Sequence, residues 1–182
     1  MNQSGDCIRV VHPLFQEEGS GSTPTSPLQL QIGRMDVWRA IELNRAWHSR
    51  LPDFASPPGH CIAYGAEFDS TFYAVAIWSP PVARMLNGRG MYELRRLAIA
   101  DDAPKNTATR MLRIMRLIVG KTFPAIRTLI SYQDTGAHAG TIYKAAGWTA
   151  TNTDPGGEWS RPSRQRAKAQ ASTPKIRWEI AA

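Results

Sequence analysis

Near the N-terminal end, the pattern of hydrophobic and polar positions predicts a strand followed by a helix. The segment "LQLQI", residues 28–32, alternates apolar and polar residues and is typical of a short strand. Asp36 then precedes a helical segment, and its carboxylate can accept hydrogen bonds from the free N–H groups of the first turn. We expect this helix to end by Leu51, because Pro52 disfavours the helical conformation of the residue before it. One face of the helix carries Val37, Ala40, Ile41 and Asn44.

Further along the chain, the pattern predicts a hairpin, a third strand and a long helix. The segments "CIAYGAEF" (61–68) and "TFYAVAIW" (71–78) flank the dipeptide "DS", which predicts an antiparallel hairpin. The segment "MYELRRLAIA" (91–100) is the next expected strand. Residues 107–119, "TATRMLRIMRLIV", have the apolar spacing of a helix. The residues at this spacing are Met111, Ile114, Met115, Ile118 and Val119.

The last part of the chain predicts three strands and a short helix. "IRTLISY" (126–132) is rich in β-forming residues, and "GTIYKAAGW" (140–148) favours a short helix that ends at Gly147, where glycine suits a left-handed cap. "WTAT" (148–151) and "KIRWEI" (175–180) are the final expected strands. The whole order predicts an α/β (α+β) fold, in which a mixed, mostly antiparallel sheet is flanked by helices.

The length and composition favour one soluble domain. A chain of 182 residues fits a single domain, which we assign to residues 28–182, with a basic insertion at about 155–174. Residues 1–27 are rich in Gly, Ser, Thr and Pro, so we expect a flexible N-terminal lead-in. Cys7 and Cys61 show no metal-ligand spacing, which favours reduced thiols. The sequence shows no secretory signal and no apolar run of roughly 20 residues, so we expect a cytoplasmic protein without a membrane segment.

The charge of the chain changes this picture, because it favours a polyanionic partner. The formal net charge is +7 and the isoelectric point is near 9.8, and nucleic acid is the commonest polyanion in a cytoplasm. Arg113 belongs to a stripe of arginines on the long helix, which is either a DNA contact or an ordinary solvated face. The basic insertion is a second candidate for following a phosphate backbone. Its candidate DNA-binding residues are Arg161, Arg164, Arg166 and Lys168.

The element order, together with "TIYKAAGW", resembles the GNAT acyltransferase fold. Proteins of that fold often carry a tyrosine four residues before a glycine-aromatic pair, on the helix that follows the fifth strand. Tyr143 matches the tyrosine, and Gly147 and Trp148 match the pair. The resemblance implies that Tyr143 acts as a general acid toward the leaving group.

A narrower resemblance links the chain to a family that modifies DNA. "ELRRLAIADDAPKNTATR", "SYQD", "GTIYKAAGW" and "WHSRLP" together resemble the Mom DNA-modification proteins of Mu-like phages, roughly from Trp38 to Trp148. The resemblance implies conversion of the adenine N6 amino group in phage DNA to a carbamoylmethyl form, which blocks host restriction. It also implies an iron requirement, DNA as the partner and a small-molecule donor of unknown identity. Such an enzyme must extract the base or act on single strands. The sequence leaves the oligomeric state open, with a homodimer as one alternative.

The segment "DDAPKNTATR", residues 101–110, departs from the usual GNAT loop that holds the pyrophosphate of CoA. The usual loop has glycines whose N–H groups, together with the positive end of a helix, hold phosphates. Here the glycines are absent, and Asp101 and Asp102 would repel a pyrophosphate, although both also suit a simple acidic turn. The residues that could still hold a cofactor are Lys105, Asn106, Thr107 and Arg110, and Asn106 or Thr107 could instead cap the helix. Acetyl-CoA is therefore a disfavoured donor.

Candidate catalytic residues lie after the first helix and around the strand "ISYQD". His48, Asp134 and Tyr143 could bind iron(II) with open positions for a substrate, and His60 or His138 could replace one of them. His48 and Asp134 could instead carry out acid–base catalysis, or His48 could simply cap a helix end. Ser131 and Tyr132 complete the candidate catalytic set; they face opposite sides of the strand, and Tyr132 shares a face with Asp134.

Three functions are consistent with these patterns. The first is a GNAT-like, Mom-type enzyme that modifies adenine in DNA. The second is a CoA-dependent N-acetyltransferase acting on a small amine or aminoacyl substrate, which the missing glycines disfavour. The third is a non-catalytic basic DNA-binding protein on a degenerate acyltransferase fold, which Tyr143, His48 and Asp134 disfavour.

Overall fold

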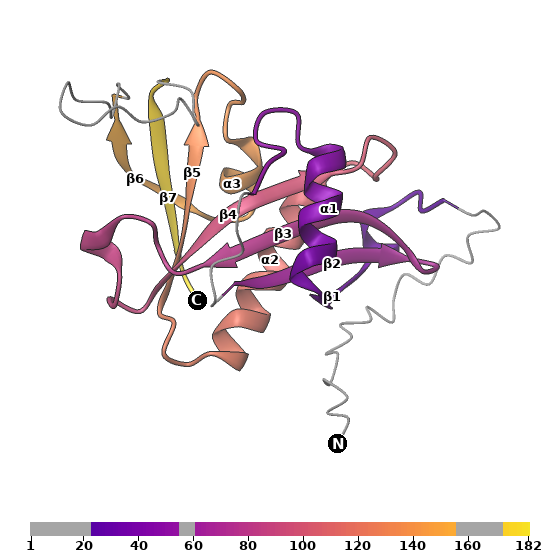
Figure 1. Ribbon diagram of the computed structural model, residues 1–182, viewed down its shortest axis with the longest axis horizontal. Helices are drawn as coiled ribbons and strands as arrows, with labels where there is room; N and C mark the ends of the chain where they lie inside the picture. Colours follow the sequence, from indigo (N-terminus) through magenta and orange to yellow (C-terminus); the bar gives the residue numbers. More distant parts are fainter. Residues whose placement is uncertain (1–22, 55–60, 156–172) are drawn as a thin grey trace.

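The strands of the described residues form one sheet, and their order decides which strand ends meet. The computed structural model describes residues 23–54, 61–155 and 173–182. The order across the sheet is β1-β2-β3-β4-β5-β7-β6 (Figure 1). The β4–β5 pair is parallel and the other pairs are antiparallel, so the mixed, mostly antiparallel sheet is confirmed. The strands are β1 (Gln31–Met35), β2 (Ile62–Phe68), β3 (Thr71–Ser79), β4 (Met91–Ile99), β5 (Thr128–Asp134), β6 (Thr149–Asp154) and β7 (Lys175–Ala181).

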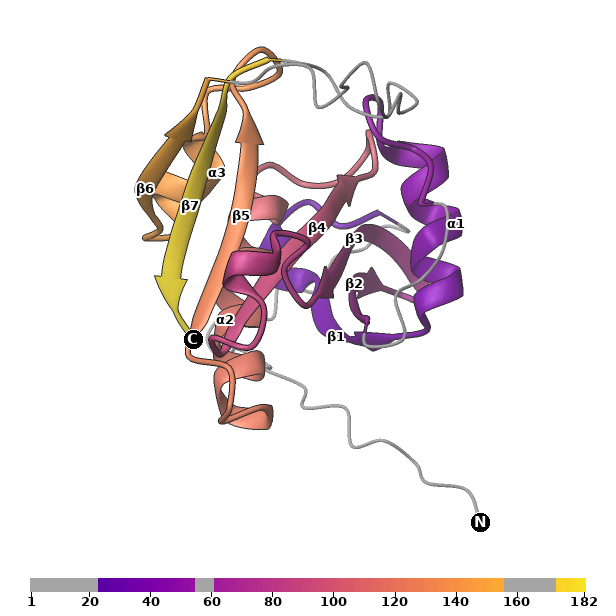
Figure 2. The same ribbon diagram turned by 60° about the vertical axis from the view of Figure 1, so that its left-hand side comes forward.

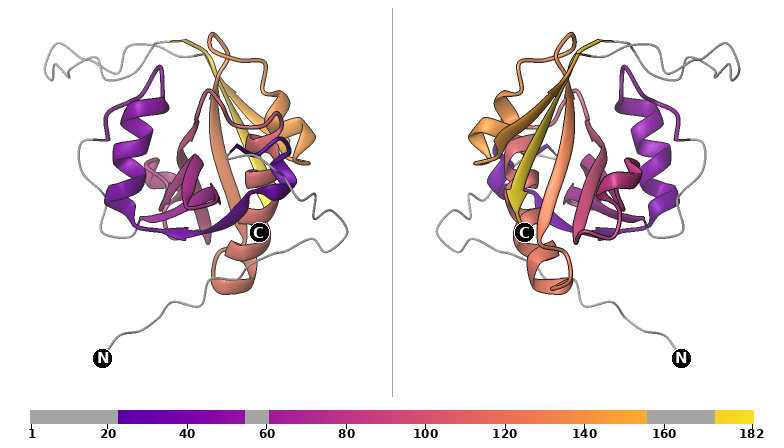
Figure 3. Two further views of the ribbon diagram at one scale, coloured as in Figure 1. Left: turned by 90° about the vertical axis from the view of Figure 1, so that its right-hand side faces the viewer. Right: turned by 90° about the vertical axis from the view of Figure 1, so that its left-hand side faces the viewer.

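Helices cover both faces of this sheet. One face carries α1 (Val37–Trp47), which packs on β2, β3 and β4. The opposite face carries α2 (Thr107–Thr122) and α3 (Thr141–Ala145), as the two views of Figure 3 show. Short 3-10 turns occur at η1 (Pro27–Gln29) and η2 (Arg84–Leu86). Among the described residues, no helix is both long and apolar enough to cross a bilayer.

The N-terminal strand begins later than the alternation predicted. Residues 27–29 form η1, because Ser26 caps this turn and the Gln29 side chain reaches back to the Ser26 N–H in a capping box. The strand then runs from Gln31 to Met35, and the expected strand at residues 28–32 is only partly correct. Local capping outweighed the short alternating pattern.

The predicted first helix and hairpin are confirmed. Asp36 caps α1 by accepting a hydrogen bond from the Arg39 N–H at 2.9 Å. β2 and β3 are joined by Asp69 and Ser70, whose φ angles are 48° and 62°. Positive φ at both central residues is the geometry of a type I′ turn, whose twist matches that of paired strands.

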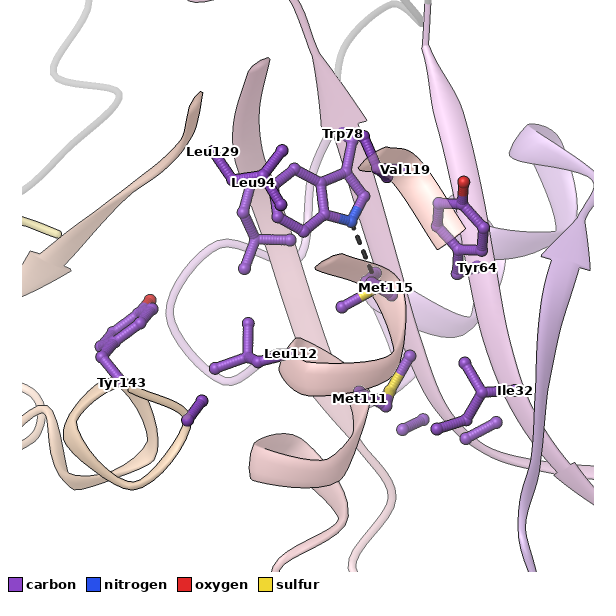
Figure 4. Packing of buried hydrophobic residues seen from close by; sticks show 14 of the residues in the cluster. Ile32, Tyr64, Trp78, Leu94, Met111, Leu112, Met115, Val119, Leu129 and Tyr143 are labelled. Atoms are coloured by element: carbon purple, nitrogen blue, oxygen red, sulfur yellow. Dashed lines mark hydrogen bonds between the residues drawn. The ribbon is translucent and has the colours of Figure 1, made fainter. Parts of the chain in front are cut away.

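The core on the α2 side is built around Trp78. Its indole N–H points to the sulfur of Met115 at 3.2 Å, and Leu112 and Leu129 pack close by (Figure 4). Each large apolar side chain buried in this way contributes about 1.5–3 kcal/mol. On the other face, Ile41 of α1 packs in a separate cluster. The sheet is therefore held between two apolar layers.

Much of the predicted lead-in (1–27) and of the basic insertion (about 155–174) lies outside the described residues. Six residues named in the sequence analysis are also outside the described residues: Cys7, His60 and the candidate DNA-binding residues Arg161, Arg164, Arg166 and Lys168. Their roles remain predictions, and so does the division of the chain into lead-in and domain.

The end of α3 has the glycine cap that the sequence predicted. Gly147 has a φ of +84°, and its N–H donates to the Lys144 carbonyl. The next N–H, of Trp148, donates back to the Tyr143 carbonyl at 3.0 Å, as in a Schellman motif. The cap therefore fixes where Trp148 enters the core.

We predict that Gly147→Ala lowers the free energy of unfolding by about 1 kcal/mol, because an added Cβ is unfavourable in the left-handed region. No atom lies within 4 Å of the position that a Cβ at Gly147 would occupy, so the cost comes from the backbone alone. Gly147→Asn should cost less, because asparagine tolerates this conformation. Urea denaturation of the three proteins measures the difference, and equal costs for Ala and Asn would contradict the explanation.

Candidate functional site

The site begins where β4 and β5 separate. The two strands pair in parallel only from Met91 to Leu94 and from Thr128 to Ser131. Beyond this point β4 continues along β3 to Ile99, whereas β5 continues along β7 to Asp134. Figure 2 shows the strands diverging toward their carboxyl ends. Backbone groups on the facing edges thus lose their partner strand, and side chains from both faces can approach the opening.

A bulge in β4 lies at the point of separation. Ile77 pairs with Arg96 and Trp78 pairs with Leu94, so Arg95 is the extra residue. The guanidinium groups of Arg95 and Arg96 both lie over the ring of Phe54, at 5.5 and 5.2 Å from its centroid. The bulge thus directs two successive arginines to the α1 face.

The α2 and α3 face of the opening carries a buried pair of hydroxyl groups. The Tyr143 hydroxyl lies 2.9 Å from the Oγ of Ser131, which is the last residue of β5 that pairs with β4. Burial raises the pKa of Tyr143, and the hydrogen bond between Tyr143 and Ser131 opposes part of this rise. Tyr143 therefore stays protonated over the physiological range and can act as a proton donor. The structure brings these two predicted catalytic residues together.

Aromatic rings enclose this pair. Tyr143 stacks on Trp178 with ring centroids 5.4 Å apart and contacts the edge of Trp148 at 5.8 Å. The indole N–H of Trp178 donates to the Gln133 side-chain oxygen at 2.8 Å. The indole N–H of Trp148 is buried and has no acceptor among the described residues. An unpaired buried donor costs free energy, so it is a natural partner for an oxygen of a bound molecule.

A pocket of about 490 Å³ lies on the same face, between the end of β4, the start of α2 and α3; we call it the α2 pocket. Three predicted cofactor-binding residues, Lys105, Asn106 and Thr107, line it. Asn106 is the N-cap residue of α2 in a left-handed conformation, and its side chain makes no capping hydrogen bond. The first N–H groups of a helix have no partner within the helix. The Thr107 N–H donates to the Pro104 carbonyl at 3.3 Å, so the next two N–H groups, of Ala108 and Thr109, are the ones placed for an anion, with the positive end of the helix dipole behind them.

The other residues of this loop behave differently from one another. The Thr107 hydroxyl donates to the Pro104 carbonyl at 2.6 Å, so it closes the turn and does not cap α2. Arg110 lies one turn into α2, and its Nε is buried without a hydrogen-bond partner among the described residues. Asp101, which we expected to repel a pyrophosphate, also lines the α2 pocket. Arg110 does not line the α2 pocket, so the groups that the pocket offers to an anion are the Lys105 side chain and the backbone N–H groups at the start of α2.

The opposite face of the opening carries Asp134, which is bound by Arg50. The guanidinium Nη2 of Arg50 lies 3.1 Å from Asp134 Oδ2. Asp134 Oδ1 accepts hydrogen bonds from the Thr173 hydroxyl at 2.7 Å and the Gly136 N–H at 2.9 Å. Partial burial alone would raise the pKa of Asp134, but these hydrogen bonds and the charge of Arg50 lower it below its ordinary value. The carboxylate is thus ionised, and both of its oxygens already accept hydrogen bonds.

The loop after α1 covers this region, as expected, but it presents Arg50 and not His48 to Asp134. His48 ends α1, and its Nδ1 accepts hydrogen bonds from the N–H groups of Arg50 at 3.3 Å and Leu51 at 3.2 Å. Burial lowers the pKa of His48, and the positive charge of Arg96 lowers it further. The neutral imidazole therefore holds the loop in shape.

The predicted iron ligands do not come together. Ser131 contacts Tyr143, and Asp134 lies three residues further along β5, so Tyr143 and Asp134 are on opposite faces of the sheet. Both oxygens of Asp134 already accept hydrogen bonds, one of them from a cation. His48 binds its own loop. These three side chains therefore do not fit a common coordination sphere for iron(II).

The possible substitute ligands give no metal site either. His138 accepts a hydrogen bond from the Gly140 N–H and lies against the ring of Tyr143 at 6.1 Å. Within residues 23–54, 61–155 and 173–182, no three His, Cys, Asp or Glu side chains are grouped to hold a metal ion. The iron requirement is thus implied by family resemblance and is not supported by this arrangement.

The remaining predicted residues lie away from the hydroxyl pair. Tyr132 faces the side of Asp134, as the strand alternation predicted, and lines a second pocket. Arg113 donates to the Ala145 carbonyl at 2.8 Å and so ties α2 to the end of α3. This contact gives Arg113 a packing role, and its DNA contact stays a prediction.

Glu93 on β4 is a buried residue that sequence analysis missed. Burial raises its pKa, although the Val82 N–H, at 2.9 Å from Oε2, and the charges of Arg95 and Arg96 act in the opposite direction. The signal available in the sequence was a single acidic residue inside the apolar run "MYELRRLAIA". Arg50 was missed because its partner Asp134 is distant along the chain.

Comparison with known families decides the membership of this chain. The model of the Mom protein family matches residues 57–170, which include β2 to β6 and every residue of the hydroxyl pair and the α2 pocket. The chain belongs to the Mom protein family. The resemblance seen in the sequence is thus confirmed. A comparison with curated proteins found no match.

Solved structures with the same fold are acetyltransferases. A Bacillus subtilis acetyltransferase in complex with CoA superposes with a TM-score of 0.61 at 10% identity, over 84% of this chain and 99% of that one. The ribosomal-protein-S18-alanine N-acetyltransferase of Escherichia coli gives 0.60 at 13% identity, over 84% and 93%. A GNAT acetyltransferase from Elizabethkingia anophelis with acetyl-CoA bound gives 0.59 at 12% identity, over 85% and 99%. At these identities the likeness establishes the GNAT fold.

We predict that Ser131 and Tyr143 are energetically coupled. Tyr143→Phe or Ser131→Ala alone leaves one buried hydroxyl without a partner, which costs about 1–3 kcal/mol of unfolding free energy. The double variant removes both hydroxyls and should cost about 1 kcal/mol less than the sum of the single changes. Denaturant unfolding of the four proteins gives this difference, and simple additivity would show that the hydroxyls do not interact.

We predict that His48 makes stability depend on pH. Its pKa is lowered in the folded protein, so the unfolded chain takes up the proton first as the pH falls. The stability that His48 contributes is therefore fully present above about pH 6.5 and is lost as the pH falls through the folded value. His48→Asn keeps an acceptor for the loop N–H groups and should flatten the fall in melting temperature between pH 7 and 5. An unchanged pH profile would contradict this role. Burial also lowers the pKa of His138, so His138→Asn should flatten the profile too, and the double variant should flatten it more than either single change.

Proposed function

We propose that this chain modifies the N6 amino group of adenine in DNA, adding a carbamoylmethyl group that protects phage DNA from host restriction. The observation that carries the proposal is the Mom family match over residues 57–170. The function is the one that the resemblance implies. The net charge of +7 supports a DNA substrate, because a basic protein attracts the phosphate backbone.

The two faces of the β4–β5 opening support a division of labour. We assign the donor to the face of α2 and α3, because the α2 pocket offers helix N–H groups to an anion and ends near α3. We assign the adenine to the opposite face, where the carboxyl end of β5 carries Tyr132 and Asp134. Donor and acceptor then meet across the separated strands.

Tyr143 is the residue we assign to proton transfer. In the proposed step, a bond forms between N6 and a carbon of the donor as the bond from that carbon to the leaving group breaks. The leaving group takes the proton of the Tyr143 hydroxyl, N6 gives up one of its own protons to water, and the Tyr143 phenolate takes a proton back from water. Burial keeps Tyr143 protonated, and Ser131 orients its hydroxyl. The buried Trp148 N–H is available for an oxygen of the donor.

A CoA-dependent N-acetyltransferase acting on a small amine or aminoacyl substrate is the second candidate. The α2 pocket favours it, since its volume of about 490 Å³ lies within the range of about 300–1,000 Å³ for small-molecule sites. Bound CoA would supply an activated acyl thioester. Lys105 and the first turn of α2 would hold its phosphates in the pocket, and the predicted role of Arg110 would require its side chain to turn toward them.

We predict that expression of this chain in a bacterium produces a heavier deoxyadenosine, detected by mass spectrometry of nucleosides from plasmid DNA. Tyr143→Phe should reduce the yield by at least about tenfold, because a general acid commonly contributes about 100-fold or more to the rate. Leu117→Ala, an exposed change on α2, is the control and should leave the yield unchanged.

Each outcome of this experiment has a distinct meaning. Only ordinary nucleosides from cells that contain folded protein would overturn the DNA-modification proposal. Acetyl-CoA binding by the same purified protein, measured by calorimetry, would then support the N-acetyltransferase. A modified nucleoside that persists in Tyr143→Phe would keep the function and remove Tyr143 from proton transfer.

A further inference from the structure

A second pocket lies on the face of the sheet opposite α3, under the loop that joins β3 to β4. Its volume is about 230 Å³, and we call it the loop pocket. Tyr132 of β5, Asn152 of β6 and Arg177 of β7 form its floor, and Met85 and Leu86 of η2 form its edge. The volume is below the range of about 300–1,000 Å³ for drug-sized ligands, so it suits a single planar base better than a whole cofactor.

The loop above this pocket is held in place and carries exposed apolar side chains. The Val82 N–H donates to the buried carboxylate of Glu93 at 2.9 Å, and the Leu86 N–H donates to the Ala83 carbonyl at 2.9 Å. Met85 is nevertheless 76% exposed and Val82 is 63% exposed. Figure 1 shows this segment, in magenta, reaching from the end of β3 toward β5 and β7. A fixed loop therefore holds a long, flexible apolar side chain out in water beside a pocket.

The charges around the loop favour a DNA strand as its partner. Arg84 and Arg89 are exposed on the loop, on either side of the apolar tip. Arg177 lies in the pocket across the strand pair from Tyr132 and pairs with Glu179 at 2.7 Å, and Asp154 and Lys175 add one charge of each sign to the lining. The exposed Arg84 and Arg89 are therefore the cations that the loop offers to phosphates. Apolar wedges such as methionine and leucine are used by DNA-binding proteins to separate stacked bases, and arginines contact the flanking phosphates.

We propose that Met85 is a wedge that opens the DNA stack, and that the displaced adenine enters the loop pocket and stacks on Tyr132. This inference rests on the proposed function, because an enzyme that modifies the adenine amino group must take the base out of the duplex. Asn152 is placed to read the edge of the base, since asparagine pairs well with adenine. Tyr132 and Asp134 share one face of β5, so the pocket opens on the side that we assign to the acceptor.

Binding of purified protein to two fluorescein-labelled DNA duplexes tests the wedge. One duplex is fully paired, and the other has an abasic site opposite a central adenine, so that the cost of opening is already reduced. Met85→Ala should weaken binding to the paired duplex by at least about tenfold and to the abasic duplex by less than about twofold. Tyr132→Ala should weaken binding to both by about tenfold, because the base contact is lost in each. Leu117→Ala is the exposed apolar control and should match the wild type on both.

Two outcomes of the binding experiment would overturn the wedge. The first is an equal loss on both duplexes in Met85→Ala, which would make Met85 an ordinary contact. The second is wild-type binding in both the Met85→Ala and Tyr132→Ala proteins. The failure of the proposed function is distinguishable, because it appears as unmodified plasmid nucleosides with the wild-type protein. Modified nucleosides from wild type, with equal yields from Met85→Ala and Tyr132→Ala, would leave the function standing and remove the inference.

Discussion

The rest of the site depends on the early end of pairing between β4 and β5. The two parallel strands share register only as far as Leu94 and Ser131, and each then follows a different neighbour. The bulge at Arg95 accompanies this change, because an extra residue increases local twist and redirects the strand. An uninterrupted sheet would separate its two faces completely. The opening instead lets a molecule bound over α2 and α3 meet one that approaches from the side of α1.

The two faces of the opening also differ in electrostatic character. On the α2 side, the hydroxyl pair of Ser131 and Tyr143 is neutral and lies among aromatic rings, where burial keeps the phenol protonated. On the other side, Asp134 is ionised and paired with Arg50. Strand alternation places these groups on opposite faces although they are close along β5. The sheet thus keeps the neutral proton donor Tyr143 apart from the ion pair of Asp134 and Arg50.

The loop after α1 connects this face to the rest of the fold. Asn44 is fully buried and donates to the carbonyls of Leu51 and Pro52, and Arg96 donates to Leu51 from the β4 bulge. The neutral ring of His48 holds the intervening N–H groups. The loop is therefore fixed by contacts from α1 and β4 at once, and Arg50 reaches Asp134 from a defined position. A histidine that looked like a metal ligand in the sequence serves as a structural acceptor.

The sequence by itself determined the order of the elements, the family, and the short helix that carries Tyr143 and ends in the cap at Gly147. These features depend on periodicity, turn residues and local motifs. Asp36, the turn at Asp69 and Gly147 acted through neighbours a few residues away. The start of β1 was displaced because a capping box at Ser26 competed with a short alternating pattern. The tertiary structure alone decided that Asp134 meets Arg50 and not His48, that Tyr143 and Asp134 lie on opposite faces, and that Glu93 fixes the loop of Met85. These contacts join residues from separate elements, and only the register and divergence of the strands bring such residues within reach of each other.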